Sequence, residues 1–574
     1  MSMDFDVAIV GGGPAGSTAA SLLKKYNPSL KVAIFEREAF PRDHVGESQL
    51  PPISGVLDEM GCWDKVEAAN FPIKVGATYK WGKSPELWDF EFVPNEVFKD
   101  EPRPAKYEGQ RRFTAFQVDR AVYDKILLDH AQEMGVEVHQ PATVREVVRD
   151  GDRIAKLVLQ DGASVIARYY IDASGHPGLI RRSMGVQSEY PTTLQNIAIW
   201  DYWQNAEWAV KIGVGGTRVQ VISVPYGWIW FIPLGPTRTS VGLVVPAAYY
   251  KASGMRPKEL YEKALKDEVM IESLMKDATS EEKLSSTKDW SFLAERVGGE
   301  NWFLIGESAG FADPILAAGL TMAHLAAREV CCTILELDRK RYTEAWLKEQ
   351  FALRQRQRVL NHIRFAEYWY TANAQFGDLK VFTSELAKDS GLDLDPDKAW
   401  RWLAQGGFIN EDEETGSSGF SLLQVKNLGH FLNELDPPGV LEQTNEFHLN
   451  LGGSSFIEKA RYQNGEVLKM RAYKRGERRL PVNEEFGYVL NLLQTEHHWP
   501  GIIKSINASA EKYRPEPEVR TRVIHRTLMA LEAMILDGWV TATHNPEYPL
   551  EDLRVTSIDI RANTDQRQLN KAFH

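Results

Sequence analysis

A run of glycines near the start of the sequence could hold the phosphates of a bound dinucleotide. The run follows the pattern Gly-x-Gly-x-x-Gly at positions 11, 13 and 16. Gly11 permits a tight turn, Gly13 lets the backbone approach a pyrophosphate, and Gly16 allows close packing of helix on strand. The helix that follows the glycines would direct its unpaired N–H groups and its positive dipole end at the phosphates.

The elements around this run support the same chemistry. Residues 4–10 and 31–35 are predicted strands, and residues 17–24 between them are a predicted helix. The second strand ends in Glu36, 20 residues beyond Gly16, where an acceptor for a ribose hydroxyl is expected. A glycine run alone occurs widely, whereas a strand, helix, strand and terminal acid in this order predict a dinucleotide-binding domain.

A second segment, residues 225–233, concentrates aromatic residues in the pattern W-x-W-x-I-P. Side chains alternate along a strand, so Trp228 and Trp230 would lie on one face. One interpretation is that both indoles pack a core. The other is that they form one wall of a reaction site, and the same strand can serve both purposes.

Two lysines, Lys74 and Lys80, lie in a predicted strand over residues 73–82. Their separation is even, so we expect both side chains on one face of the strand. A desolvated lysine supplies a hydrogen-bond donor or, when deprotonated, an amine. The alternative is that such a lysine lies at the surface where a strand begins.

The remaining elements predict where these residues are held. Residues 196–245 contain β-branched stretches with Gly and Pro breaks, which predicts a mostly antiparallel sheet. An apolar strand at 302–305 leads through a glycine-containing turn to a long helix at about 320–337. Residues 116–120 open a helix, and Arg120 lies either near the cofactor or in solvent beside a capped helix.

The C-terminal part has no counterpart of the dinucleotide elements. Residues 484–493, 501–506 and 519–537 are predicted helices, and 538–541 a predicted strand, which together resemble a winged-helix module. Winged helices often bind DNA, but net charge −12 and a pI of about 5.7 argue against a nucleic-acid surface. A lid or a docking site for a carrier protein is the preferred interpretation.

Composition excludes several classes of protein. Cys62 and the adjacent Cys331 and Cys332 cannot build a disulfide framework, and the adjacent pair is expected to be buried thiols. The sequence contains no signal peptide and no uncharged apolar stretch of about 20 residues, so we expect no membrane span and a cytoplasmic protein. The pair at 497–498 has no suitably spaced carboxylates, and no metal site is expected.

Taken together, the glycine run, Gly46-Glu47-Ser48, the K-x-G-A-x-x-x-W-G element from Lys74 and W-x-W-x-I-P resemble the flavin-dependent halogenases. The resemblance is to the phenol, pyrrole and carrier-associated branch, similar to chloramphenicol-pathway halogenases. It implies an α/β fold with an FAD-binding, Rossmann-like domain of the para-hydroxybenzoate-hydroxylase type and an antiparallel substrate sheet. The expected division is a core over 1–380, with the substrate sheet within about 190–300, and a mainly helical, winged-helix-like lobe over 381–574.

The family's chemistry assigns roles to residues of this sequence. Reduced FAD and dioxygen oxidise chloride or bromide to hypohalous acid, which Lys74 directs to the substrate, while Trp228 and Trp230 keep substrate from the flavin. The helix N-terminus at Ala318 and Gly319 would bind halide through backbone amides. The resemblance implies a set of cofactor-binding residues: Gly11, Gly13, Pro14, Ala15, Gly16, Glu36, Glu47, Ser48, Arg120 and Asp313.

The resemblance also bears on substrate and partners. Tryptophan-directed members carry a Glu where this sequence has Leu316, which favours an activated small-molecule or carrier-bound substrate over free tryptophan. Asp289 corresponds to a position at which a covalent flavin link is conceivable, although such an Asp more often caps a turn. No second nucleotide fingerprint follows, so a separate flavin reductase is expected. The alternatives are a flavin-dependent hydroxylase, a prenyl-lipid reductase of the same fold, and a non-catalytic flavoprotein.

Overall fold

The structure is a computed structural model that describes most of the chain. The described residues are 3–81, 87–93, 98–99, 101–209, 215–288, 291–372, 440–476, 478–482, 484–513, 517–536, 538–551 and 560–562. Two compact units divide the chain: unit 1 comprises Met1–Asn373, Ala460–Leu468 and Ala562–His574, and unit 2 comprises Ala374–Lys459 and Lys469–Arg561. The boundary expected at residue 380 lies outside the described residues.

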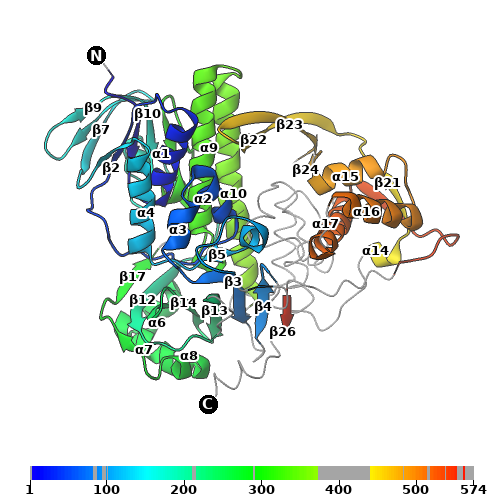
Figure 1. Ribbon diagram of the computed structural model, residues 1–574, viewed down its shortest axis with the longest axis horizontal. Helices are drawn as coiled ribbons and strands as arrows, with labels where there is room; N and C mark the ends of the chain where they lie inside the picture. The colour runs from blue at the N-terminus through cyan, green and yellow to red at the C-terminus, as the bar shows by residue number, and fades with distance from the viewer. Residues whose placement is uncertain are drawn as a thin grey trace. The chain divides into compact units, whose positions relative to one another are not determined.

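A five-stranded parallel sheet carries the predicted dinucleotide-binding unit (Figure 1). Its strands, in spatial order, are β19 (Trp302–Leu304), β10 (Ala167–Asp172), β1 (Phe5–Val10), β2 (Val32–Phe35) and β6 (Glu137–His139). Helix α1 (Pro14–Tyr26) connects β1 to β2, as the sequence predicts. The helices that pack with this sheet in one apolar core include α4 (Arg120–Glu133) and α9 (Gly319–Arg339).

A second, larger sheet, here called the Trp sheet, contains the two tryptophans. Its strands include, in spatial order, β16 (Thr279–Ser280), β12 (Asn196–Gln204), β15 (Arg238–Pro246), β14 (Gly227–Pro233), β13 (Gly216–Val224), β3 (Ile73–Lys80) and β4 (Trp88–Glu91). Strands β12 to β15 pair antiparallel, as predicted for residues 196–245. Strand β3 comes from the N-terminal part of the chain and joins β13 in parallel.

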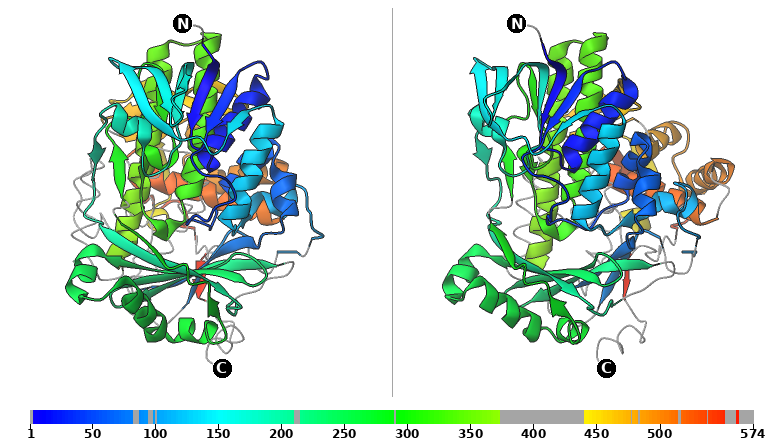
Figure 2. Two further views of the ribbon diagram at one scale, coloured as in Figure 1. Left: turned by 90° about the vertical axis from the view of Figure 1, so that its left-hand side faces the viewer. Right: turned by 60° about the vertical axis from the view of Figure 1, so that its left-hand side comes forward.

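Three short helices cover one face of the Trp sheet. Helices α6 (Ala247–Ser253), α7 (Pro257–Asp267) and α8 (Val269–Leu274) lie on the side away from the parallel sheet (Figure 2). Ile222, Ile229 and Leu243 belong to the apolar core on this covered face. Trp228 and Trp230 flank Ile229 in β14. Side chains alternate along a strand, so both indoles occupy the other face.

A β-bulge in β3 contradicts the expectation that the two lysines share a face. Lys74 pairs with Thr217, but Gly76 pairs with the next residue, Arg218, so Val75 is an extra residue in the ladder. The bulge shifts the alternation by one residue. Lys80, which pairs with Ile222, therefore faces α7 and α8, whereas Lys74 shares the face of the two tryptophans.

A hairpin from the C-terminal part of the chain completes unit 1. Strands β22 (Ser455–Gln463) and β23 (Glu466–Arg475) form it, and its tip packs on α9 and on α10 (Glu344–Ala372). Tyr462 and Val467 bury their side chains in one cluster with Cys332 and Leu347. Cys331 and Cys332 are buried free thiols, as predicted.

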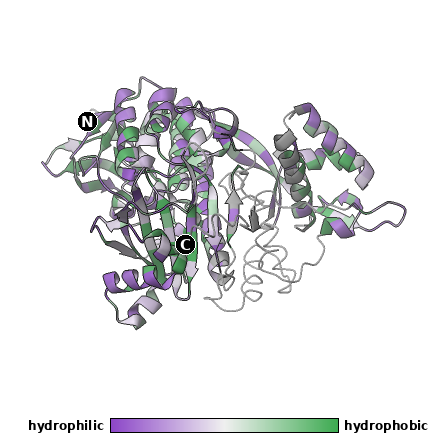
Figure 3. Cartoon of the chain, turned by 60° about the horizontal axis from the view of Figure 1, so that its bottom comes forward, coloured by the Kyte–Doolittle hydropathy of each residue, from purple (hydrophilic) through white to green (hydrophobic). Residues whose placement is uncertain are grey.

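Unit 2 contains the three predicted C-terminal helices. They are α15 (Glu484–Leu492), α16 (Trp499–Tyr513) and α17 (Pro517–Leu536), accompanied by α14 (Val440–Gln443), β21 (Glu446–Leu449), β24 (Arg478–Pro481) and β25 (Val540–Thr543). Trp499, Trp539 and Phe447 lie in the core of this unit. Its helices mix hydrophobic and hydrophilic residues, green and purple in Figure 3, as expected of helices that each bury one side.

The remaining elements are short, and two of them, β5 and β17, pair with β3 and β12 of the Trp sheet. They are α2 (Pro52–Met60), α3 (Trp63–Ala68), η1 (Gly109–Phe113), β5 (Ala115–Phe116), β7 (Val144–Asp150), β8 (Arg153–Leu159), β9 (Ser164–Val165), α5 (Leu179–Ser183), β11 (Ser188–Glu189), β17 (Ser285–Lys288), β18 (Phe292–Ala294), η2 (Gly306–Ser308), β20 (Gly310–Phe311), η3 (Pro314–Leu316) and β26 (Ile560–Ala562). Within the described ranges, no helix is long and apolar enough to cross a membrane.

Candidate active site

The glycine turn after β1 has the shape that a pyrophosphate requires. Gly11 has φ +105°, and a Cβ there would lie 2.3 Å from the Ala173 carbonyl oxygen. A Cβ on Gly16 would lie 2.0 Å from the Gly11 carbonyl oxygen. The nearest atom to a Cβ on Gly13 is Nη2 of Arg42, at 3.6 Å, so the protein alone does not require a glycine there. The space beside Gly13 therefore fits a ligand at the start of α1.

Glu36 and Arg42 place opposite charges next to this turn. The buried Glu36 carboxylate accepts hydrogen bonds from the backbone N–H groups of Gly12 (2.6 Å) and Glu38 (2.9 Å), which fixes it at the end of β2. The Arg42 guanidinium, close to Gly13, could neutralise phosphate charge. The sequence analysis missed Arg42 because nothing in its spacing distinguishes it from a surface arginine.

Arg120 is buried, which excludes the solvent-exposed alternative. Asp119 caps α4 through the Ala121 N–H, and Arg120 forms a bidentate pair with Asp124 at 2.7 and 2.9 Å. Its Nη1 also donates to the carbonyls of Val45 (3.0 Å) and Gly46 (3.1 Å). Arg120 thereby holds the loop that presents Gly46-Glu47-Ser48.

Glu47 connects this loop to the Trp sheet. Its carboxylate accepts from the Tyr202 hydroxyl (3.0 Å) and from the Gly46 N–H (3.0 Å). Burial raises the pKa of Glu47 to about 7, although the hydrogen bond from Tyr202 opposes this shift. Ser48 forms a β-bridge with Gln117, and the buried Ser48 hydroxyl and Gln117 amide have no hydrogen-bond partner among the described residues. Buried polar groups in that state are suited to a ligand.

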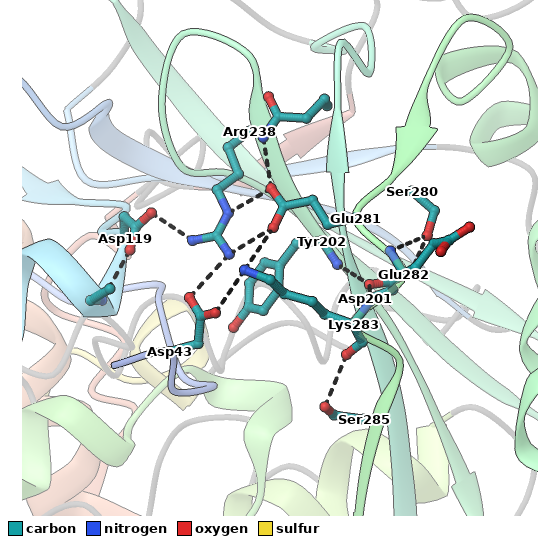
Figure 4. Close-up of polar contacts among 12 residues, drawn as sticks. Asp43, Asp119, Asp201, Tyr202, Arg238, Ser280, Glu281, Glu282, Lys283 and Ser285 are labelled. Carbon is teal, nitrogen blue, oxygen red and sulfur yellow. Dashed lines mark hydrogen bonds and ion pairs between the residues drawn. The ribbon is translucent and has the colours of Figure 1, made fainter. Parts of the chain in front are cut away.

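An ion cluster beside Tyr202 anchors the same loop (Figure 4). The Arg238 guanidinium, from β15, contacts three carboxylates, those of Asp43 (3.1 Å), Asp119 (2.6 Å) and Glu281 (3.0 Å). It also lies 4.0 Å above the Tyr202 ring, and Lys283 forms a second ion pair with Asp43 at 2.9 Å. The cluster attaches the loop that follows β2 to the neighbouring ends of strands β12 and β15.

The N-terminus of α9 has the geometry of an anion site. Ala317 has φ +51°, Ala318 is the N-cap, and the 21-residue helix begins at Gly319. Within the described part of the chain, the buried Thr321 hydroxyl, in the first turn, has no hydrogen-bond partner. Unpaired N–H groups and the helix dipole there favour an anion. The predicted halide-binding residues Ala318 and Gly319 therefore lie where such a site can form.

The starts of α1 and α9 lie side by side. A Cβ on Gly306, in η2, would come 3.3 Å from Cβ of Ala15 and 3.7 Å from Cβ of Ala323. These small residues let η2 and the two helices meet closely. The first turn of α1 therefore packs close to the second turn of α9.

Asp313 contacts protein groups with both carboxylate oxygens. Oδ1 accepts from the Ile315 N–H (2.9 Å) and the Tyr370 hydroxyl (3.2 Å), and Oδ2 accepts from Nδ2 of Asn196 (3.1 Å). Burial raises its pKa to about 7. Direct cofactor binding by Asp313 stays a prediction. Neither Asn196 nor Tyr370 was identified from the sequence, because both are far from Asp313 along the chain.

Trp228 and Trp230 form a buried aromatic pair with ring centroids 6.0 Å apart. The Trp228 indole donates to the Tyr370 hydroxyl (2.8 Å), and the Trp230 indole donates to Ser240 (3.1 Å). A Cβ on Gly242 would lie only 2.1 Å from the Trp230 ring, so this glycine makes room for the indole. Both indoles are held in place, as a rigid wall requires.

Lys74 differs from Lys80 in burial and in partners. Lys74 is 1% exposed, its ammonium group lies 5.4 Å from the Phe92 ring centroid, and burial lowers its pKa to about 7. Lys80 is partly exposed and forms an ion pair with Glu268 on the helix-covered face. Lys74 therefore has the environment expected of a catalytic amine, and Lys80 does not.

Two predicted features cannot be described. Asp289, the conceivable covalent flavin link, and the side chain of Leu316 lie outside the described residues. Among the residues that are described, no three His, Cys, Asp or Glu side chains gather in a way that could hold a metal ion.

Comparison with known proteins identifies the family. A sequence profile described as tryptophan halogenase matches residues 6–102 and 98–377. The chain belongs to the tryptophan halogenase family. A Pseudomonas fluorescens 1H-pyrrole-2-carbonyl-[peptidyl-carrier protein] chlorinase is 34% identical over 58% of this chain and 76% of that protein. A Chondromyces crocatus tryptophan 2-halogenase is 33% identical over 55% of this chain and 58% of its own length.

Solved structures agree with this family. The flavin-dependent halogenase CmlS covers 97% of this chain and 98% of its own, with 25% identity and a TM-score of 0.69. The myxobacterial chondrochloren halogenase CndH covers 76% and 98%, with 26% identity and a TM-score of 0.59. The resemblance to flavin-dependent halogenases is confirmed, with FAD as cofactor, and the match favours this activity over a hydroxylase or a prenyl-lipid reductase.

Proposed function

We propose that this tryptophan halogenase family member halogenates an activated substrate, phenolic, pyrrolic or carrier-bound, and that Lys74 directs the oxidised halogen. Bound FAD, once reduced, supplies the oxidising chemistry with dioxygen. Hypohalous acid then replaces a C–H bond of the substrate by a carbon–halogen bond and releases water. The observation that carries the proposal is the position of Lys74, buried on the same face of the Trp sheet as Trp228 and Trp230.

Each proposed role has support in the site. An amine with a pKa near 7 is partly uncharged at neutral pH, so Lys74 can accept a proton or an electrophilic halogen. The first turn of α9, with Ala318 and Gly319, would bind chloride or bromide. The open space at Gly13 and the carboxylate of Glu36 fit the FAD pyrophosphate and ribose.

The partners follow from the same reasoning. A relative named for a peptidyl-carrier-bound pyrrole supports a carrier-bound substrate for this chain. We further propose that a separate flavin reductase supplies reduced FAD and that the protein acts in the cytoplasm. Phenol, pyrrole, free tryptophan and carrier-bound pyrrole probes, incubated with reductase, NADH and bromide, distinguish the substrate classes by the bromine isotope pattern of the product. A brominated product from tryptophan alone would refute the substrate proposal.

The role of Lys74 is tested with matched variants. Lys74→Ala should still consume reduced FAD and dioxygen while giving no brominated product, because the lysine acts after halide is oxidised. Lys74→Arg should fail likewise, since a guanidinium does not deprotonate at working pH. Lys80→Ala should keep its product yield per reduced flavin consumed, because that side chain faces α7 and α8. Full yield in Lys74→Ala would assign the role to another residue.

A further inference from the structure

The Tyr370 hydroxyl joins three buried side chains that come from different parts of unit 1. It accepts hydrogen bonds from Nε1 of Trp228 (2.8 Å) and Nδ2 of Asn196 (3.2 Å), and it donates to Oδ1 of Asp313 (3.2 Å). The four side chains are each 1–3% exposed. A hydroxyl has one proton and two lone pairs, so these three bonds use its full capacity.

Through Asp313 the network reaches the predicted halide site. The same Oδ1 that accepts from Tyr370 also accepts from the Ile315 N–H, and this bond shapes the η3 turn. The next residue after η3 is Ala317, whose positive φ sets the direction of Ala318 and α9. A displacement of Asp313 would therefore move the first turn of α9.

Through the Trp sheet the network reaches the strand of Lys74. Trp228 lies in β14, and the Tyr370 ring packs edge-on against Trp81, which follows β3, with centroids 6.4 Å apart. The Tyr79 hydroxyl, also from β3, donates to the Ile315 carbonyl at 3.2 Å. The tryptophan wall, the strand of Lys74 and the η3 turn thus meet around one residue of α10.

We infer that Tyr370 is a positioning residue that fixes the Trp228 wall relative to the anion-binding turn at the start of α9. It touches neither cofactor nor substrate in this role and acts through Trp228 and Asp313. The inference rests on the proposed halogenation. The Tyr370 hydroxyl thereby maintains two properties, the affinity for halide and the yield of halogenated product per reduced flavin consumed.

Tyr370→Phe removes the hydroxyl and keeps the ring. The matched control is Tyr261→Phe, because Tyr261 is also buried beside the Trp sheet, accepts an indole N–H from Trp203 (2.9 Å) and donates to the Val241 carbonyl (2.9 Å). Tyr261 belongs to α7, which covers the face of the Trp sheet opposite to Trp228 and Trp230. Both changes remove one buried hydroxyl, so both are expected to lower the melting temperature to a similar extent.

Two measurements distinguish positioning from general stability. In FAD-loaded protein, the bromide concentration that gives half of the maximal bromide-induced rise in melting temperature should increase at least fivefold in Tyr370→Phe and stay within twofold in Tyr261→Phe. Brominated product per reduced flavin consumed should fall at least tenfold in Tyr370→Phe, with released peroxide making up the difference. Equal effects in the two variants, or a wild type that bromide does not stabilise, would overturn the inference.

A double-mutant comparison tests the route of action. Residues that act as one unit give strongly non-additive effects. Combining Tyr370→Phe with Trp228→Phe should change bromide response and product yield no further than the stronger single variant does. Fully additive losses would refute action through Trp228. If wild type gives no product with any probe but shows the Tyr370-dependent bromide response, the proposed function fails while this positioning role stands.

Discussion

The charge state of Lys74 gives a prediction about stability that does not depend on catalysis. Burial lowers the pKa of this amine from 10.5 to about 7. Each tenfold change in proton affinity is worth about 1.4 kcal/mol, so at pH 7 this site disfavours the folded state by about 4 kcal/mol. Lys74→Met keeps the length of the side chain without its charge and should remove that cost.

The sign of the pH dependence follows from which state binds the proton. Between pH 7 and pH 10.5, the unfolded lysine is protonated and the folded one is not, so stability rises with pH and the cost disappears. At pH 7, Lys74→Met should therefore melt higher than wild type by roughly 5 °C, from the typical unfolding entropy of a unit of this size. At pH 10 the difference should be close to zero.

The assay is thermal melting of flavin-free protein from pH 7 to pH 10, followed by tryptophan fluorescence. Lys80→Met is the control, because Lys80 is paired with Glu268 and its removal leaves that buried carboxylate without its partner. The control should melt lower than wild type throughout. If the melting curves of wild type and Lys74→Met shift in parallel with pH, the amine stays protonated in the fold and the argument is refuted.

Three further predictions concern other parts of the chain. Gly13→Val should fold normally, because the position is open, yet lose flavin absorbance by blocking the pyrophosphate; a folded variant that retains FAD would reassign this turn. The melting temperature of Asp313→Asn should rise relative to that of wild type between pH 4 and pH 8. The pKa of Asp313 is raised to about 7 in the fold, so the wild-type protein loses stability as this carboxyl deprotonates; a constant difference would contradict burial of the charge. A chain ending at residue 373 should bind the apolar dye ANS more than the full-length protein, because Ala460–Leu468 no longer covers Cys332 and Leu347; equal dye binding would argue against this packing.

The sequence predicted the local elements of the FAD site well. The strand, turn and helix at Gly11 to Gly16 depend on neighbouring residues, and so does the long helix that begins at Gly319. The antiparallel strands around Trp228 also follow from β-branched stretches bounded by Gly and Pro. Such patterns are local, so a single sequence contains them.

Features that depend on distant pairing were not predictable in this way. The bulge at Val75 lies where β3 pairs with β13, and it puts Lys74 and Lys80 on opposite faces. Strand alternation alone predicted that both lysines share one face. A glycine at position 76 is the only local signal of the bulge. Tyr370 contacts Asp313 and Trp228, which are 57 and 142 positions away in the sequence. Helix α10 shows no sequence pattern that distinguishes this tyrosine from its neighbours.

The hairpin tip at Ala460–Leu468 has a consequence for synthesis of the protein. Ribosomes make residues 374–459 before this segment appears, so a nascent FAD-binding unit waits with the surface of Cys332 and Leu347 uncovered. Exposed apolar surface of this kind makes folding intermediates prone to aggregate, and contacts between distant segments form late. Chaperone demand during translation should therefore be greatest between the completion of α10 and the emergence of β23.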